Sequence, residues 1–269
     1  MSDAPIQGRF ADKTIMVTAA ASGIGEACVQ LLLDQGATVY ASDIDLDALE
    51  SRFGSDDALG DRLHLGRLDV SSYDAVKAYT ESIKAATDHL DGLVNNAGLG
   101  SWGSVDNLDV NRWHTVIGVT LDSVFFTAKE TMSLLRKRGG SIVNTASISG
   151  MFGDNGFAAY NAAKGGVINL TRTLAIDHAH EGVRANTVCP GRIDTPRVSW
   201  MSQNEEIISE YDRRVPMRRD GQAREVADAI AFLLSDESSF ITGVALPIDG
   251  GLTASAGQPQ FLRLLPDRV

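Results

Sequence analysis

The feature that most constrains the fold is a regular alternation between short apolar runs typical of β-strands and longer runs with helical periodicity. Strands are predicted at residues 14–18, 38–42, 63–68, 92–95, 141–145, 184–188 and 245–248. Helices are predicted at residues 25–35, 45–52, 73–87, 111–135, 158–180 and 224–234. Strands that alternate with helices imply right-handed crossovers, so the sequence predicts an α/β fold with a seven-stranded parallel, doubly wound sheet and helices on both faces.

The length of the chain and two of its segments indicate how it is organised into domains. A chain of 269 residues favours one domain, residues 1–269, since two enzyme domains need more residues. Residues 197–219 interrupt the alternation, as lids over substrate sites do. Residues 254–269 follow the last strand and are expected to form either a tail on the surface or a contact between subunits of an oligomer.

Charge and cysteine content narrow the partners and the compartment. The net charge of −11 opposes binding to nucleic acid or to anionic membranes. Cys28 and Cys189 lie far apart in the sequence, which favours a reducing compartment over a disulfide framework. Residues 1–13 lack a secretory signal, and no apolar run approaches the roughly 18 residues of a membrane span. We therefore expect a cytoplasmic protein with no membrane segment.

The first strand is followed by Thr-Ala-Ala-Ala-Ser-Gly-Ile-Gly, residues 18–25, and then by an amphipathic helix. A small-residue turn at a helix N-terminus presents free N–H groups and a positive dipole end to an anion, here a pyrophosphate. The G-x-G-x-x-G fingerprint is absent, so a plain structural turn is the alternative.

Polar residues follow three further strands. Asp43 ends the second strand, where a carboxylate meets the adenosine ribose hydroxyls of a dinucleotide. Its alternative role is a helix cap, which Asp45 could supply equally well. Asp69 and Val70 follow the third strand, and residues 95–98 follow the fourth. Together these strand ends line one edge of the sheet, where a dinucleotide would lie.

Tyr160 and Lys164 are four residues apart in a strongly helical segment, so they share one helix face. A phenol with a pKa near 10 can act as acid or base at neutral pH only if a cation stabilises its anion, and Lys164 can supply that field. Ser147 ends the fifth strand and can hydrogen-bond a substrate oxygen. The trio predicts proton transfer to or from an alcohol.

In this order and spacing the motifs resemble those of the classical short-chain dehydrogenase/reductase family, over about residues 10–253. They include the 18–25 turn, the trio, Cys189-Pro190-Gly191 with Ile193-Asp194-Thr195, and Ile248-Asp249-Gly250-Gly251. The resemblance implies a Rossmann fold, a nicotinamide cofactor and reversible oxidation of an alcohol to a carbonyl.

The resemblance also implies roles for single residues. Tyr160 would be the general acid/base, Ser147 would orient the substrate, and Lys164 would hold the ribose hydroxyls and lower the pKa of Tyr160. Ile193 and Thr195 would contact the nicotinamide end, and Asn96 the adenosine ribose side. The full set of expected cofactor contacts is Ala19, Ser22, Gly23, Ile24, Gly25, Asp43, Ile44, Asp69, Val70, Asn96, Ala97, Gly98, Tyr160, Lys164, Pro190, Gly191, Ile193 and Thr195.

Two positions depart from the family pattern. Ala19 stands where the family has Gly; a positive φ there would cost about 1 kcal/mol, whereas the turn could also keep a negative φ. Thr120 stands where the catalytic tetrad has Asn, a position that helps to hold a water through its backbone carbonyl. Activity is therefore expected, with Thr120 as the fourth catalytic position.

Three aromatic residues are expected around the substrate. Trp102, Phe152 and Trp200 fall on segments that the resemblance places there, and they form either ordinary packing or an apolar substrate wall. His178 and His180, two apart at a helix end, point to different faces, so no metal site is expected.

We expect an NAD(H)-dependent enzyme that interconverts a secondary alcohol and its ketone and assembles as a homotetramer through helices 111–135 and 158–180. NAD is expected because the chain neighbours of Asp43, which are Ser42, Ile44 and Asp45, offer no cation to a 2′-phosphate. One alternative is a 3-oxoacyl thioester reductase that prefers NADPH. An alternative from another class is a catalytically impaired nucleotide-binding regulatory protein, suggested by Thr120 and Ala19.

Overall fold

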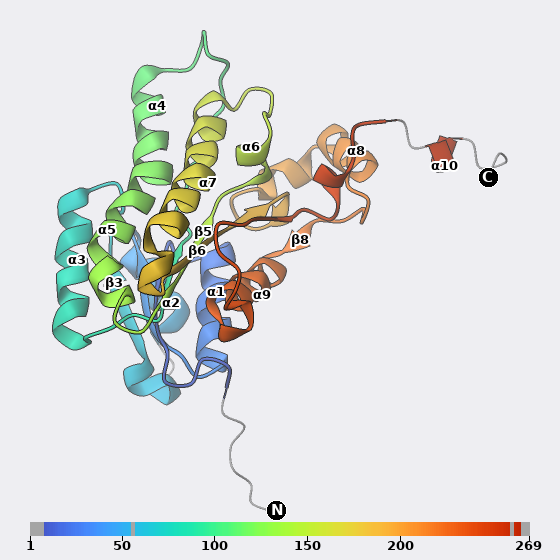
Figure 1. The fold of residues 1–269 in the computed structure, drawn as a ribbon. Coiled ribbons are helices and arrows are strands. Elements are labelled where there is room, and N and C mark those ends of the chain that lie inside the picture. Colours follow the sequence, from blue (N-terminus) through green and yellow to red (C-terminus); the bar gives the residue numbers. More distant parts are fainter. Residues whose placement is uncertain (1–7, 55–56, 259–260, 265–269) are drawn as a thin grey trace, which may run out of the picture.

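The structure, a computed structural model, describes residues 8–54, 57–258 and 261–264. Its centre is a seven-stranded parallel sheet in the order β3-β2-β1-β4-β5-β6-β9 (Figure 1). The strands are β1 Thr14–Thr18, β2 Thr38–Asp43, β3 Leu63–Arg67, β4 Gly92–Asn95, β5 Ser141–Thr145, β6 Arg184–Pro190 and β9 Ala245–Ile248. The seven-stranded parallel sheet expected from the sequence is confirmed.

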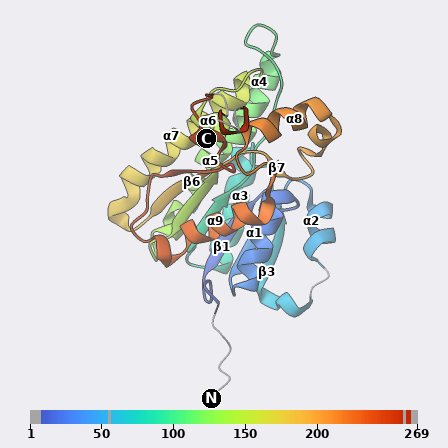
Figure 2. The same ribbon diagram turned by 90° about the vertical axis from the view of Figure 1, so that its right-hand side faces the viewer.

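Helices cover both faces of this sheet (Figures 1 and 2). The α-helices of the described residues are α1 Gly23–Asp34, α2 Leu46–Phe53, α3 Tyr73–Ala86, α4 Val110–Ile117, α5 Ser123–Leu135, α6 Ile148–Met151, α7 Ala158–His178, α8 Glu205–Arg214, α9 Ala223–Leu234 and α10 Phe261–Leu264. The last of these, α10, lies in the C-terminal tail, away from the sheet (Figure 1). The single helix expected at 111–135 is divided into α4 and α5 by a π-helical turn, Gly118–Asp122.

The two largest apolar clusters of the core lie on opposite faces of the sheet. Ile15 and Val17 of β1 join the cluster under α1 and α9, whereas Met16 joins the cluster under α3 and α5. This division follows from the strand geometry, because successive side chains of a strand point to opposite faces. A strand buried on both faces reads as a continuous apolar run, as 14–18 does.

The segment 197–219 begins and ends at a small parallel ladder that the sequence did not predict. Strand β7 (Ile193–Asp194) pairs with β8 (Gly221–Gln222), and α8 lies between them in the chain. Arg192 holds this region together, because its guanidinium lies 3.0 Å from the Asp220 carboxylate and 5.0 Å from the Tyr211 ring centroid. Figure 2 shows α8 at the same end of the sheet as α4 and α6.

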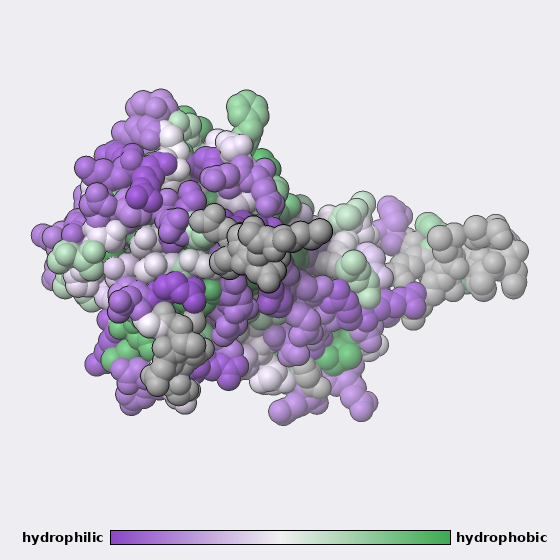
Figure 3. Space-filling model, turned by 90° about the horizontal axis from the view of Figure 1, so that it is seen from below, coloured by the Kyte–Doolittle hydropathy of each residue, from purple (hydrophilic) through white to green (hydrophobic). Residues whose placement is uncertain are grey.

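The opposite end of the molecule, seen from below in Figure 3, is mostly hydrophilic with small separate apolar areas. In the described ranges no helix combines the length and apolar character that a membrane crossing requires. Of the tail expected at 254–269, positions 259–260 and 265–269 lie outside the described residues.

Candidate active site

A cavity of about 950 Å³ lies at the carboxyl ends of β4, β5 and β6. Ligands of open parallel sheets bind at this edge. Ser147 and Tyr160 line the cavity, together with side chains from the 99–102 loop and from α8. The structure therefore brings two of the three expected catalytic residues to one hollow, from positions thirteen residues apart.

Lys164 lies one helical turn from Tyr160 on α7, with its Nζ 5.7 Å from the Tyr160 ring centroid. Its side chain is buried, and Nζ donates a hydrogen bond of 2.5 Å to the carbonyl oxygen of Thr145 at the end of β5. That bond ties α7 to the strand that carries Ser147. The expected grouping of Ser147, Tyr160 and Lys164 is therefore present in the structure.

The hydroxyl of Ser147 belongs to a short hydrogen-bond chain. Its Oγ donates to Ser149 Oγ at 3.2 Å, and Ser149 Oγ donates to the carboxylate of Asp154. Ser147 Oγ also accepts a bond of 3.1 Å from the backbone N–H of Ser149. Ser147 is the N-cap of α6, which fixes its side chain at the end of β5.

The surroundings of Tyr160 and Lys164 shift the pKa of both side chains. Burial raises the pKa of the Tyr160 phenol above its ordinary value, while hydrogen bonding to Ser147 and the Arg197 guanidinium lower it. Burial and the same guanidinium lower the pKa of Lys164 to about 7. Ser147 and Arg197 therefore oppose the rise in the Tyr160 pKa that burial causes.

The turn after β1 has the backbone geometry of a tight phosphate cradle. Ala19 and Gly23 both have positive φ angles, 52° and 58°, so of the two alternatives for Ala19 the strained one holds. A Cβ on Gly25 would lie 2.0 Å from the Ala19 carbonyl oxygen. Ser22, the N-cap of α1, makes no side-chain capping bond. The N-terminus of α1 therefore keeps the N–H groups that suit a dinucleotide diphosphate.

Asp43 does not cap the following helix. Asp45 caps α2 by accepting a bond of 3.0 Å from the N–H of Ala48. Asp43 instead accepts bonds from the N–H groups of Ala21, at 3.0 Å, and Asp45, at 3.1 Å. The capping alternative is therefore wrong, and the carboxylate of Asp43 lies beside the phosphate turn.

The surroundings of Asp43 also include the neighbouring strand. The chain neighbours offer no cation, but Arg67 of β3 is the register partner of Asp43 in the β2–β3 ladder. Partners in neighbouring strands stand about 5 Å apart. A basic residue therefore lies on the strand next to Asp43, although the chain neighbours of Asp43 include none. Ile44, next in the chain, is exposed.

The remaining expected cofactor contacts gather at the same edge. Asn96 donates through Nδ2 to the Ala19 carbonyl at 3.1 Å. A Cβ on Gly98 would lie 3.0 Å from Lys164 Nζ, and one on Gly23 would lie 3.1 Å from the Thr195 methyl. The motif that contains Thr195 therefore meets the first turn.

The other members of this set follow the ends of β3, β4 and β6. Asp69 accepts bonds from the N–H and hydroxyl of Ser71 at 2.9 and 2.6 Å, and Val70, Ala97 and Ile193 are buried. Pro190 ends β6, and the N–H of Gly191 donates to the Ile248 carbonyl at 3.0 Å. Gly191 has no room for a side chain, because its Cβ would lie 2.9 Å from that of Asp249.

Thr120 lies in the π-helical turn and is fully buried. Its hydroxyl accepts a bond of 3.0 Å from the backbone N–H of Leu99. π-Helical turns are frequent at functional sites. The side chain of Thr120 therefore holds the loop that leads into the cavity.

The aromatic residues form one cluster beside Tyr160. The Trp102 ring lies 4.3 Å from that of Phe157 and 5.3 Å from that of Trp200, and Phe157 lies 6.1 Å from Tyr160. Phe152 also lines the cavity and is exposed. Phe157, which the sequence did not single out, is the N-cap residue of α7 and precedes Tyr160 by three residues.

Arg197 is a second residue that the sequence analysis missed. It lines the cavity and donates a hydrogen bond through Nη2 to the carbonyl oxygen of Gly98. Its position two residues after Thr195 was a signal that could have placed it near the cofactor motif.

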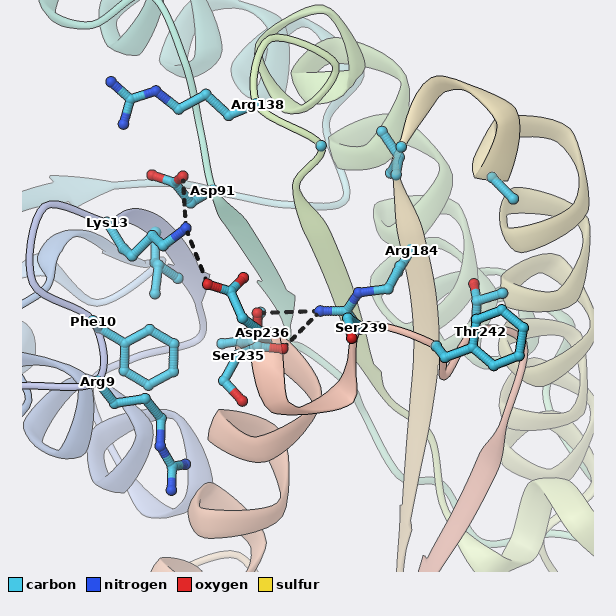
Figure 4. A pocket seen from close by; sticks show the side chains of 17 residues that line it. Arg9, Phe10, Lys13, Asp91, Arg138, Arg184, Ser235, Asp236, Ser239 and Thr242 are labelled. Atoms are coloured by element: carbon cyan, nitrogen blue, oxygen red, sulfur yellow. Dashed lines mark hydrogen bonds and ion pairs between the residues drawn. The ribbon is translucent and has the colours of Figure 1, made fainter.

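A second cavity, of about 480 Å³, lies at the amino ends of the strands. Figure 4 shows Lys13 between Asp91 and Asp236, at 3.6 and 3.9 Å. Arg184 donates to backbone carbonyls that include those of Leu233 and Ser235. Lys13 is thus paired with carboxylates and Arg184 with backbone carbonyls, so this cavity has the character of a structural junction.

Neither a metal site nor an activated thiol is found among the described residues. No group of three or more His, Cys, Asp or Glu side chains there could hold a metal ion. Burial raises the pKa of Cys28 to about 12 and that of Cys189 to about 11, so neither is an activated nucleophile.

Comparison with known proteins agrees with this geometry. A family profile described as enoyl-(acyl carrier protein) reductase matches residues 18–253. The chain is 39% identical to meso-2,3-butanediol dehydrogenase of Serratia marcescens, over 94% of this chain and 100% of the relative. It is 37% identical to cyclohexanol dehydrogenase of Acinetobacter sp. (strain SE19), over 93% and 98%. The solved structure of levodione reductase superposes with a TM-score of 0.85 at 31% identity, over 91% and 99%.

The chain is a short-chain dehydrogenase/reductase. Its fold is the Rossmann-like fold of that family, and it is an oxidoreductase of a family that uses NAD(P)(H). The relatives are similar enough over the whole chain to establish the family, while their substrates differ from one another.

Proposed function

We propose that this short-chain dehydrogenase/reductase interconverts a secondary alcohol and its ketone with NAD as cofactor. The observation that carries the proposal is the grouping of Ser147, Tyr160 and Lys164 beside a cavity with an aromatic wall. Relatives named for 2,3-butanediol and cyclohexanol are consistent with a secondary alcohol as substrate.

Each residue of the trio has a task that its surroundings support. Tyr160 takes the proton of the alcohol as general base, and Ser147 donates a hydrogen bond to the reacting oxygen. Lys164, fixed to the Thr145 carbonyl, orients the cofactor ribose and passes the proton onward. Thr120 supports the loop at Leu99 as the fourth position. NAD supplies the acceptor for the hydride that leaves the carbon.

The cofactor would lie along the sheet edge from the 18–25 turn to Thr195. The N–H groups at the start of α1 suit its diphosphate, and Asp43 suits the diol of its adenosine ribose. The remaining residues of the expected cofactor set lie at the same strand ends, which supports their assignment. Trp102, Phe152 and Trp200 would form the substrate wall, with 197–219 as a lid.

We further propose a homotetramer in the cytoplasm. Val110, Trp113, Phe125 and Ile176 are exposed on α4, α5 and α7, and apolar helix faces of this kind mark self-association surfaces. Both cysteines are buried free thiols, which suit a reducing compartment.

To test this proposal, the purified protein is incubated with a panel of secondary alcohols and either NAD or NADP. Turnover is measured by the absorbance of reduced nicotinamide. We expect turnover with cyclic and acyclic secondary alcohols and NAD. A 3-oxoacyl thioester reductase, the activity named for a relative from Thermotoga maritima that is 37% identical, would instead reduce acetoacetyl-CoA with NADPH and leave the alcohols unchanged. A regulatory protein would bind the nucleotide without turnover of either class.

A further inference from the structure

Three arginines line the cavity that contains Ser147 and Tyr160, and they differ in their partners. Arg192 lies 3.0 Å from the carboxylate of Asp220, and Arg214 lies 3.3 Å from that of Glu210. For Arg197, the described residues provide only the carbonyl oxygen of Gly98. A guanidinium has five N–H donors, so one carbonyl leaves most of them available for a further acceptor.

Arg197 is also the arginine that acts on the reacting groups. The carbonyl that it holds belongs to Gly98, where a Cβ would lie 3.0 Å from Lys164 Nζ. Its charge lowers the pKa of both Tyr160 and Lys164. Burial is the larger cause in each case, raising the pKa of Tyr160 and lowering that of Lys164. A cation therefore lies within electrostatic reach of the carbon–oxygen bond that reacts.

The other charges of the cavity have partners or lie on α8. Asp154 accepts a hydrogen bond from Ser149, and its charge raises the pKa of Tyr160 by less than Arg197 lowers it. Glu210 is paired with Arg214, and Glu206 lies in the first turn of α8. The rest of the wall near Tyr160 is the aromatic cluster of Trp102, Phe157 and Trp200. The cavity thus places an apolar wall, large enough for a ring, beside Arg197, a cation that is not paired with a carboxylate of the described residues.

We propose that Arg197 recognises a carboxylate on the substrate, so that the preferred substrates are hydroxy acids with an apolar, ring-sized body. This inference rests on the proposed function, because the hydroxyl that reacts is the one that Tyr160 deprotonates. The planar guanidinium forms two parallel hydrogen bonds with a carboxylate, which fixes the position of the substrate as well as binding it. On binding, Arg197 exchanges the Gly98 carbonyl for this stronger acceptor.

An anion at Arg197 could also be the diphosphate of the dinucleotide. The cavity favours the substrate as its source, because Ser147 and Tyr160 line it with Arg197 while residues 19–25 of the phosphate turn do not. The experiment has to separate these two sources.

The test compares cis- and trans-4-hydroxycyclohexanecarboxylate with their primary amides, which have the same shape without the charge. In the unmodified protein we expect kcat/KM for the acid to exceed that for the amide. Arg197→Met should lower the acid-to-amide ratio by about 30-fold, the range of a charge-assisted pair. Arg197→Lys should restore part of the ratio, because it keeps the charge and loses the two-point geometry. The control is Arg138→Met, because Arg138 lies at the opposite end of the sheet (Figure 4). This variant should leave the acid-to-amide ratio unchanged.

Several results would overturn the inference. An equal loss for acid and amide, or a weakened Kd for NADH in a fluorescence titration of Arg197→Met, would assign the guanidinium to the cofactor. Turnover of the amides and of cyclohexanol without a preference for the acids would overturn the inference and leave the proposed function intact. Failure of all these alcohols with both cofactors would overturn the proposed function together with the inference.

Discussion

Asp43 and Arg67, the last residues of β2 and β3, are register partners in the parallel sheet although they are separated by an entire helical connection. An acidic and a basic residue therefore end neighbouring strands at the edge where the adenosine ribose of a dinucleotide would lie. The carboxylate favours the diol of NAD, whereas the guanidinium favours the 2′-phosphate of NADP. We therefore expect both side chains to influence the choice between NAD and NADP.

This expectation predicts the cofactor preference of the unmodified enzyme and of two variants. The unmodified enzyme should prefer NAD by about ten- to a hundredfold in kcat/KM, since like charges in contact cost several kcal/mol and Arg67 offsets part of that cost. Asp43→Ser should weaken NAD and improve NADP. Arg67→Ala in the Asp43→Ser background should abolish the improvement. Steady-state kinetics with both cofactors on one alcohol measure all three, and an unchanged ratio in Asp43→Ser would show that Asp43 only holds the turn.

Replacement of the proposed general base should separate turnover from cofactor binding. Tyr160→Phe keeps the ring and removes the hydroxyl, so we expect kcat to fall by about 10²- to 10⁴-fold. The Kd for NADH should change by no more than about twofold, because the phenol contributes little to holding the dinucleotide. Fluorescence titration and steady-state kinetics provide the two measurements. Substantial residual turnover would exclude Tyr160 as the acid/base.

The buried Lys164 should make stability depend on pH in a defined direction. Burial, followed by Arg197, lowers the pKa of Lys164 to about 7 in the folded protein, while the unfolded chain keeps a value near 10.4. Between these values the unfolded state binds more protons, so the contribution of Lys164 to stability rises as the pH rises from 7 to 10.

Lys164→Met removes this dependence. The variant should melt a few degrees above the unmodified protein at pH 7, since each kcal/mol corresponds to about 2–4 °C in a chain of this size. The difference should shrink as the pH approaches 10. Lys77→Met, at an exposed position of α3, is the matched control and should leave the melting temperature unchanged. A difference for Lys164→Met that is the same at pH 6 and pH 9.5 would contradict the assignment.

The positive φ of 52° at Ala19 predicts an order of stability among substitutions. A β-branched residue is strained in that region more than Ala, so Ala19→Val should lower the free energy of unfolding by about 1–2 kcal/mol. Ala19→Gly and Ala19→Asn should not destabilise the protein, because both residues tolerate a left-handed conformation. Chemical denaturation measures the three variants; a neutral Val variant would show that the turn relaxes at no cost.

The exposed apolar faces of α5 and α7 predict the oligomeric state. Phe125 and Ile176 are 51% and 78% exposed, and we expect light scattering to give the mass of a tetramer at micromolar concentration. Phe125→Glu and Ile176→Glu place a charge in the proposed contact and should give smaller species. A monomer mass for the unmodified protein would refute the homotetramer.

The sequence by itself determined the sheet and its order of elements. Apolar runs such as 14–18 and 92–95 are buried on both faces, so their periodicity is visible without knowledge of the partner strands. The grouping of Tyr160 with Lys164 was equally predictable, because residues four apart on a helix share one face. The motifs at strand ends converge for a similar reason, since parallel strands end at one edge.

Only the tertiary structure decided which side chains meet across that edge. The pairing of Arg67 with Asp43 depends on strand register, and the position of Arg197 beside Gly98 depends on the path of a long connection. The sign of φ at Ala19 depends on the close approach of Gly25 to its carbonyl. The low pKa of Lys164 comes from burial by several elements at once. Such properties arise from contacts between residues distant in the chain, which local periodicity and spacing do not encode.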